Sequence, residues 1–154
     1  MFDIRGNKQK VKNIRFTEFD ATKKLHAKYI NYADSISSTF AIGHFGLGRY
    51  GDKIDLNGHK KGLLNLYKML KKNGYLYLSV PIGLQKIVGN YHRIFSITTI
   101  LSMLSGKFIV CSFSYIDDYG DLHTDQDFDL KNNEVIDNYG CKYGSGIFEC
   151  RKIG

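Results

Sequence analysis

The chain has 154 residues, of which 43% are hydrophobic and 24% charged, an ordinary composition for a globular protein. That length can bury a substantial core, so we expect residues 1–154 to form a single domain. Because the first residues are polar and basic, we expect no secretory signal peptide. The longest apolar run, residues 94–104, is too short to span a membrane.

The formal net charge is +7 and is unevenly distributed. Basic residues gather between Arg5 and Lys28, and acidic residues between Asp117 and Asp137. Such asymmetry can mark a nucleic-acid-binding face, and solvated lysine-rich faces are the alternative. No nucleic-acid-binding motif accompanies the charge, so we expect no nucleic-acid partner.

The cysteines bear on metal binding and on the cellular compartment. Cys111, Cys141 and Cys150 lack the C-x-x-C spacing of zinc sites, so we expect no metal site. Their odd number favours a reduced, cytoplasmic protein.

The amino-terminal part predicts two short strands. Residues 2–4 read as the tail of a strand that carries Asp3 at its end. Residues 13–19 alternate apolar and polar side chains, which indicates a second strand, followed by the segment 20–22. Residues 24–32 predict a short helix or an irregular linker.

A strand and a glycine-rich loop follow. The alternation over residues 35–42 predicts the strand, and residues 43–52 form the loop. In an open α/β sheet, ligands bind where loops leave the carboxyl ends of strands. On this loop His44 suits a base, Arg49 an anion clamp and Asp52 a hydroxyl acceptor. We therefore predict the functional site here.

Residues 46–51 of that loop match the pattern G-x-G-x-x-G. The dinucleotide-binding form of this pattern requires a helix that starts within the turn. Here residues 52–57 intervene before the next helical pattern. We therefore favour a glycine-rich loop packed on the sheet edge over a nucleotide site.

Helical spacing of apolar side chains predicts a helix over residues 59–71, with Asn57 as its N-cap and Asn73-Gly74 as its stop. Residues 75–80 form an apolar run of the kind buried in a parallel sheet. Ser96 is expected to cap a second helix through Leu104.

The carboxyl-terminal part predicts a long strand over residues 107–116, an acidic loop over 117–138, and a last strand over 147–151. The order of elements predicts an α/β fold. We expect a Rossmann-like, mostly parallel sheet that ends in an antiparallel hairpin.

The succession of strand, loop, helix, Leu70-Lys-Lys-Asn-Gly74 and strand resembles the carboxyl half of class I S-adenosylmethionine-dependent methyltransferases. Four boxes resemble one branch of them, a domain-of-unknown-function family of bacteria and nematodes. The boxes are His44-Phe-Gly-Leu-Gly-Arg-Tyr-Gly-Asp52, Val80-Pro-Ile-Gly83, Asn90-Tyr-His-Arg93 and Asn138-Tyr-Gly-Cys-Lys-Tyr-Gly144. The resemblance covers nearly the whole chain and implies S-adenosylmethionine as cofactor.

The resemblance also implies roles for single residues on the cofactor side. Asp3 resembles the acidic residue that holds the cofactor ribose, and Asp20 with Ala21 resembles the adenine contact. An Asp that follows a strand is also a common turn former, and this alternative stays open for Asp20.

On the acceptor side, His44 is the candidate catalytic base, and bonding of loop backbone is the alternative for it. Arg49, Asp52, His92 and Arg93 are candidate substrate-binding residues. His92-Arg93 would hold an anionic group. The alternative is pairing with Asp52 or Asp55.

One departure from the methyltransferases concerns the amino terminus. There the first strand and its glycine turn precede the acid that Asp3 resembles, so the resemblance implies an amino-truncated domain that lacks the first strand. We therefore expect S-adenosylmethionine to bind weakly or not at all. A second departure is Gly43, where many relatives carry Glu.

Two functions follow from the resemblance. The first is O-methyl transfer to a sugar or related hydroxyl in surface polysaccharide synthesis, with a small molecule or glycan as acceptor. The second is a non-catalytic remnant, or a subunit that needs another chain to complete the cofactor site. Homo-oligomerisation stays open.

Overall fold

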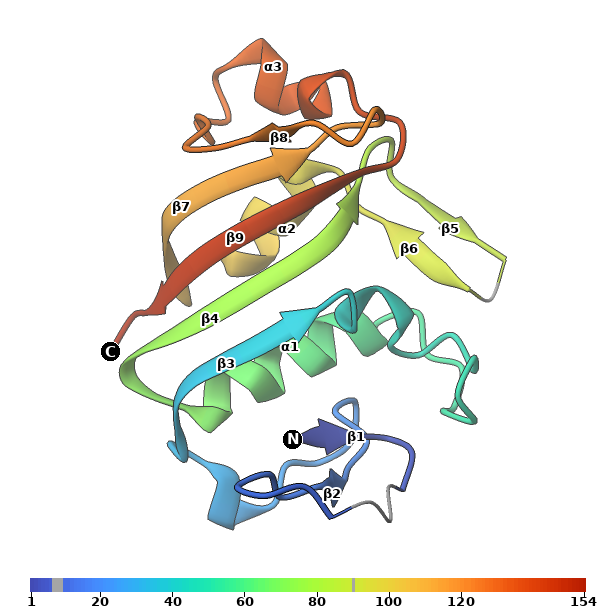
Figure 1. The fold of residues 1–154 in the computed structure, drawn as a ribbon, viewed down its shortest axis with the longest axis vertical. Helices are drawn as coiled ribbons and strands as arrows, with labels where there is room; N and C mark the ends of the chain where they lie inside the picture. Colours follow the sequence, from blue (N-terminus) through green and yellow to red (C-terminus); the bar gives the residue numbers. More distant parts are fainter. Residues whose placement is uncertain (7–9, 90) are drawn as a thin grey trace.

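The structure is a computed structural model that describes residues 1–6, 10–89 and 91–154. Its centre is a five-stranded sheet with the order β3-β4-β9-β7-β8 (Figure 1). The strands are β3 (Ala33–Thr39), β4 (Leu70–Ile82), β7 (Phe108–Ile116), β8 (Leu122–His123) and β9 (Gly144–Lys152).

Strand direction follows the predicted pattern. β3 pairs parallel with β4, whereas β9 is antiparallel to both of its neighbours, β4 and β7. β3, β4 and β7 therefore run one way, and β9 returns between β4 and β7. The mostly parallel Rossmann-like sheet and its carboxyl-terminal antiparallel pair are confirmed.

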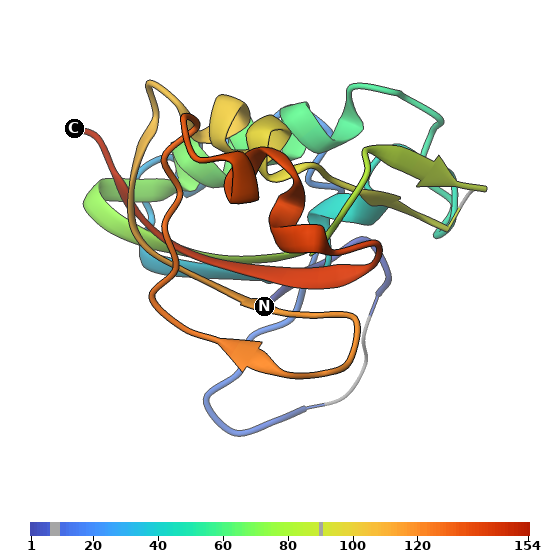
Figure 2. The ribbon, with the colours of Figure 1, turned by 90° about the horizontal axis from the view of Figure 1, so that it is seen from above.

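Two helices cover one face of this sheet, α1 (Gly58–Met69) and α2 (Ile97–Leu104), as Figure 2 shows. The alternation of β4 explains the arrangement. Leu76, Leu78 and Val80 are buried, while Tyr77 between them is 45% exposed. Burial of each aliphatic side chain contributes about 1.5–3 kcal/mol, which fixes the register of the central strand.

The amino-terminal residues form a separate two-stranded parallel sheet, β1 (Phe2–Asp3) with β2 (Thr17–Glu18). Aromatic packing holds it to the 3-10 helix η1 (Ala27–Tyr29), because the Phe2 ring lies 5.0 Å from Tyr29 and 6.0 Å from Phe19 between centroids. The predicted strand over residues 13–19 is thus shorter, and 24–32 holds only one 3-10 turn.

The remaining elements lie in the connections. The 3-10 helix η2 (Ile42–His44) follows β3, and the hairpin of β5 (Lys86–Val88) and β6 (His92–Ile94) follows β4. The segment predicted as an acidic loop carries β8, α3 (Asn133–Ile136) and η3 (Asn138–Gly140). No helix in the described part of the chain is long and apolar enough to cross a membrane.

Helix capping agrees with the prediction at one helix and differs at the other. Ser96 Oγ accepts from the Thr99 amide at 3.1 Å, so the predicted cap of α2 is confirmed. Asn57 occupies the N-cap position of α1, but its side chain makes no capping bond. Instead Asp55 accepts from the Asn57 amide at 2.9 Å and orders the turn from outside the helix.

The predicted stop at Asn73-Gly74 is not a turn between elements. β4 begins at Leu70, directly after α1, and Asn73 lies inside that strand with φ +61°. A left-handed residue within a strand is tolerated best by Asn or Gly. The pair therefore marks an irregularity of the strand, at the register shift between Ala33 and Ser35 of β3.

His59 on α1 makes the fold sensitive to acid. Burial, then the positive charges of Arg93 and Lys60, lower the pKa of His59 to about 4. In the unfolded chain this histidine takes up a proton near pH 6.5. The contribution of neutral His59 to the free energy of unfolding is therefore fully present above pH 6.5. Up to about 3 kcal/mol of it is lost as the pH falls to 4.

We expect His59→Phe to flatten the decline of stability between pH 6.5 and 5, as measured by urea unfolding. The phenyl ring can keep the contact with Phe95, whose ring centroid lies 5.7 Å away. His26→Gln, at an exposed histidine, serves as the control and should leave the slope unchanged. An unchanged slope in His59→Phe would contradict this assignment.

Candidate functional site

The glycine-rich loop leaves the carboxyl end of β3 and packs onto the start of α1. Gly46 has φ +73°, and a Cβ there would lie 2.1 Å from the Asp55 carbonyl oxygen. A Cβ on Gly58 would lie 2.8 Å from the Gly46 Cα. These glycines permit close packing of loop against helix, and α1 starts at Gly58, outside the turn. The loop thus serves close packing, as predicted, but it packs against the start of α1 rather than on the sheet edge.

His44 is oriented by the backbone of the β5–β6 connection. Its Nδ1 contacts the carbonyl oxygen of Tyr91. Because a carbonyl can only accept, Nδ1 carries the hydrogen, and the lone pair of the neutral ring lies on Nε2. Arg49 Nη1 donates to the same carbonyl at 3.2 Å. The contact with Tyr91 thus joins the two predicted loop residues to a segment far away in sequence.

His92, on β6, lies beside His44, with ring centroids 6.2 Å apart. Burial, then the positive charges of His44 and Arg49, lower the pKa of His92. Its Nε2 is buried and has no hydrogen-bond partner among the described residues. His92 is therefore a neutral ring with one polar atom still to be satisfied.

Three exposed tyrosines surround these histidines. Tyr50 is 38% exposed, and Tyr91 and Tyr143 are each 57% exposed. The Arg49 guanidinium carbon lies 5.4 Å from the Tyr50 ring centroid and 5.5 Å from that of Tyr91. Tyr143 lies 5.5 Å from the ring of His92. We call this set the His44 cluster: His44, Arg49, Tyr50, Tyr91, His92 and Tyr143.

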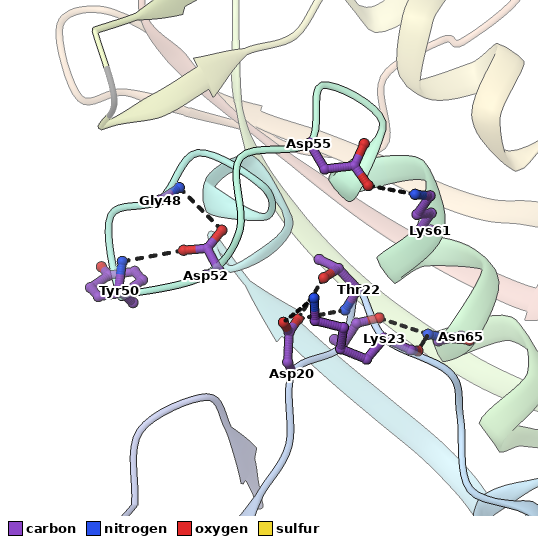
Figure 3. A network of polar contacts seen from close by, with 10 residues as sticks. Asp20, Thr22, Lys23, Gly48, Tyr50, Asp52, Asp55, Lys61 and Asn65 are labelled. Carbon is purple, nitrogen blue, oxygen red and sulfur yellow. Dashed lines mark hydrogen bonds and ion pairs between the residues drawn. The ribbon is translucent and has the colours of Figure 1, made fainter.

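Asp52 shapes the loop from within. Its carboxylate accepts from the amides of Gly48 at 3.2 Å and Tyr50 at 3.3 Å (Figure 3). The structure brings His44, Arg49 and His92 together around the Tyr91 carbonyl. Asp52 belongs to the same loop, but its oxygens are engaged with backbone amides.

Arg93 departs from its predicted place among the substrate-binding residues. It is only 2% exposed, and its guanidinium donates to the carbonyls of Phe45 at 2.6 Å, Gly43 at 3.4 Å and Leu56 at 3.4 Å. Burial lowers the pKa of this guanidinium, which the charges of Asp52 and Asp55 oppose. The geometry favours a positioning role, because Arg93 holds the two residues that flank His44.

A groove of about 720 Å³ begins at His44 and Tyr50 of the His44 cluster and runs between β1 and β3. The predicted cofactor residues Asp3, Asp20 and Ala21 line it, together with His44, Tyr50 and Asp52 of the loop. The structure therefore brings the predicted cofactor side and acceptor side to one continuous surface.

The acidic groups of this groove already have local partners. The Asp3 carboxylate accepts from Nε and Nη2 of Arg5, each at 3.0 Å, and these bonds lower the pKa of Asp3. Asp20 Oδ1 accepts from the Thr22 amide at 2.8 Å and hydroxyl at 2.7 Å (Figure 3). Asp20 thus forms a turn, as one of its two alternatives has it, and it also lines the groove.

Sequence reasoning did not single out the tyrosines as site residues. Tyr91 and Tyr143 stand in two of the boxes quoted for the family resemblance, which is the one signal that pointed to them. Asn90, in the first of these boxes, lies outside the described residues. The hairpin β5–β6 places Tyr91 and His92 over the loop.

Comparison with known proteins decides the family. The model of a family described as "Caenorhabditis protein of unknown function, DUF268" matches residues 2–145. The chain belongs to this family. No curated protein matches the sequence closely enough to assign an activity.

Solved structures resemble this DUF268 chain in fold. BH2331 of Bacillus halodurans, named as a candidate methyltransferase, has a TM-score of 0.59 at 14% identity, over 94% of this chain and 74% of its own. The MccD protein scores 0.56 at 12% identity, over 90% and 67%. The [4+2]-cyclase SpnF scores 0.55 at 12% identity over 90% of this chain, which spans 56% of the SpnF length. At such identities the likeness shows the fold alone, and that fold is methyltransferase-like.

Proposed function

We propose that this DUF268 chain is a methyltransferase domain that transfers the methyl group of S-adenosylmethionine to a hydroxyl of a sugar. The observation that carries the proposal is the His44 cluster, which lies where the glycine-rich loop meets the β5–β6 hairpin. It combines a histidine of defined tautomer with exposed aromatic rings, at the mouth of a groove. We further propose that it acts on cytoplasmic precursors of surface polysaccharide.

His44 supplies the base in this proposal. Its Nδ1–H is held by the Tyr91 carbonyl, so Nε2 accepts the proton of the acceptor hydroxyl. Holding of the ring by a backbone carbonyl also fixes its orientation, as a positioned general base requires. A contribution of about 10²–10⁴ in rate is typical of such groups.

The tyrosines and Arg49 supply the acceptor surface. Exposed aromatic rings offer apolar faces with polar edges, which suits the C–H faces and hydroxyls of a pyranose. Arg49 is 3.2 Å from the Tyr91 carbonyl through one nitrogen, and its fork has further N–H groups for an anionic sugar substituent.

The groove residues fit part of S-adenosylmethionine. When bound, this molecule supplies an electrophilic methyl group on a sulfonium. Asp3 and Asp20, with the backbone of Ala21, line the groove and carry acceptors for the nucleoside half. The described residues place no glycine turn between β1 and β3 that would bind the amino-acid half.

A second candidate function follows from that gap. The chain is then a subunit that does not catalyse alone and gains a complete cofactor site from another chain. The observation that favours it is the division of the strands into two sheets, with β1–β2 apart from β3 and the groove between them.

The two candidates differ in a methyl-transfer assay. We expect the chain, given millimolar S-adenosylmethionine with an isotopically labelled methyl group, to label methyl glycosides of common hexoses. His44→Gln should lower the rate by about 10²-fold or more. His26→Gln is the matched control at an exposed histidine and should keep the wild-type rate.

Label in the glycoside at equal rates in wild type and His44→Gln would refute His44 as the base. The absence of labelled glycoside with the wild-type chain would refute the enzyme acting alone and favour the second candidate.

A further inference from the structure

β3 is an edge strand without the usual protection. It is seven residues long, Ala33–Thr39, and contains neither Lys nor Pro. The opposite edge of the sheet, β8, is only two residues long. Proteins blunt exposed edges with short strands, lysine, proline or a covering segment, because open edges pair with other chains. The edge of β3 is therefore a template for strand pairing.

The backbone of β3 shows which groups are available. The Phe40 amide donates to the Ser79 carbonyl of β4 at 3.0 Å. Because successive residues of a strand direct their backbone groups to opposite sides, Ser35, Ser37 and Thr39 direct N–H and C=O away from β4. These three residues present the open side of the ladder, and all three line the groove.

β1 presents a second open edge to the same groove. The amides of Thr17 and Phe19 donate to the carbonyls of Met1 at 2.9 Å and Asp3 at 2.8 Å. By the same alternation Phe2 directs its backbone away from β2, and Phe2 also lines the groove. In Figure 1 the arrows of β1 and β3 point the same way. The groove thus lies between two strands that run in one direction.

The floor of the groove suits side chains of an extended segment. Ile36 of β3 and Leu66 and Met69 of α1 line it and provide an apolar surface. Ser38, only 4% exposed, also lines it, and its hydroxyl has no hydrogen-bond partner in the described part of the chain. A buried hydroxyl without a partner is unfavourable, and a polar group of an inserted segment would satisfy it.

We propose that this groove binds an extended segment of another polypeptide as a strand parallel to β1 and β3. The segment would bond to the backbones of Ser35, Ser37 and Thr39 on one side and Phe2 on the other. Its alternate apolar side chains would cover Ile36, Leu66 and Met69. This is the addition of a strand to a sheet edge, here closing two sheets into one.

A second copy of this chain is a poorer occupant. Two copies of β3 related by a twofold axis would pair antiparallel and engage one edge only. The proposal rests on the second candidate function, in which another chain completes the cofactor site, and it names the kind of segment that this chain would insert. Its test needs neither S-adenosylmethionine nor a sugar, so its failure is distinct from failure of the methyl-transfer proposal.

The test uses a fluorescein-labelled peptide of alternating threonine and valine with a terminal lysine, followed by fluorescence anisotropy. We expect saturable binding to the wild-type chain and binding at least about tenfold weaker to Ser37→Pro, because proline removes the central open-edge donor. Edge strands tolerate proline where the missing N–H faces outward. Ser37→Ala keeps that N–H and should bind as wild type does.

A second peptide, N-methylated at every other residue, removes donors from the ligand and should also bind at least about tenfold more weakly. In hydrogen exchange, the unmodified peptide should protect the amides of Ser35, Ser37 and Thr39. Equal affinity of the two peptides, equal affinity of Ser37→Pro and Ser37→Ala, or no saturable binding would overturn the proposal. A dimer of the chain that Ser37→Pro dissociates would replace the partner with a second copy.

Discussion

Replacing Arg93 with methionine is expected to lower the free energy of unfolding by about 2–4 kcal/mol. The reason is the set of three backbone carbonyls, of Gly43, Phe45 and Leu56, that the guanidinium satisfies in the interior. Methionine fills similar space but donates nothing, and each buried acceptor left unpaired costs about 1–3 kcal/mol. Relief from burying the Arg93 charge offsets part of that loss.

Urea unfolding at neutral pH measures this effect, with Arg49→Met as the matched control. Arg49 makes its hydrogen bond at an exposed site, so its loss should cost less than about 1 kcal/mol. Arg93→Lys should fall between them, because one ammonium cannot reach three divergent carbonyls as a planar guanidinium does. Equal losses in Arg93→Met and Arg49→Met would show that the buried bonds are not what stabilises the loop.

The same comparison separates positioning from substrate binding. If Arg93 holds Gly43 and Phe45 on either side of His44, replacing Arg93 disturbs the His44 ring even though the two side chains are not in contact. The contact of His44 Nδ1 with Tyr91 then loses its fixed geometry. A direct substrate contact, by contrast, would leave stability unchanged when Arg93 is replaced.

Much of the fold could be predicted because its strands and α1 carry strong periodic patterns. The apolar side chains of β4 and the helical spacing of α1 determine which face is buried, and burial dominates the energy. Local patterns fail at boundaries. Asn73 with Gly74 has the composition of a turn, yet it lies within β4, between Leu70, which pairs with β3, and Tyr75, where pairing with β3 resumes and pairing with β9 begins.

The candidate site was predictable only where its residues share one loop. His44 and Arg49 are close in sequence, so the loop itself brings them together. Tyr91 reaches them through the β5–β6 hairpin, and Tyr143, just before β9, reaches His92. No local pattern encodes these contacts. Arg93 was predicted to hold an anionic group because its guanidinium fork matches such groups. The carbonyls that it bonds instead come from loop turns that the sequence does not show.

S-adenosylmethionine is expected to bind this chain weakly, with a dissociation constant of about 1 mM or above. The described residues offer contacts for its nucleoside half at Asp3, Asp20 and Ala21, and no backbone turn for its amino-acid half. A hydrogen bond nets about 0.5–1.5 kcal/mol, and up to about 3 when one partner is charged. The absence of two or three such bonds costs about a hundredfold or more in affinity.

Titration calorimetry with two ligands tests that reasoning, because adenosine lacks the amino-acid half. If only nucleoside contacts exist, adenosine and S-adenosylmethionine should bind within a few-fold of each other. Asp3→Asn should weaken both equally, since the carboxylate lines the groove. Asp34→Asn is the matched control, because Asp34 pairs with Lys71 on the strand without lining the groove.

Micromolar binding of S-adenosylmethionine with much weaker adenosine would contradict the expectation. It would mean that this chain alone contacts the carboxylate and amine of the cofactor, and Arg5 would then be the first residue to test. Its guanidinium lies at the groove, bonded to Asp3 and 4.8 Å from the Tyr50 ring centroid. Weak and equal binding of adenosine and S-adenosylmethionine would instead indicate that the contacts for the amino-acid half are missing from the space between β1 and β3. The strand that we propose from another polypeptide would supply those contacts through its own backbone amides.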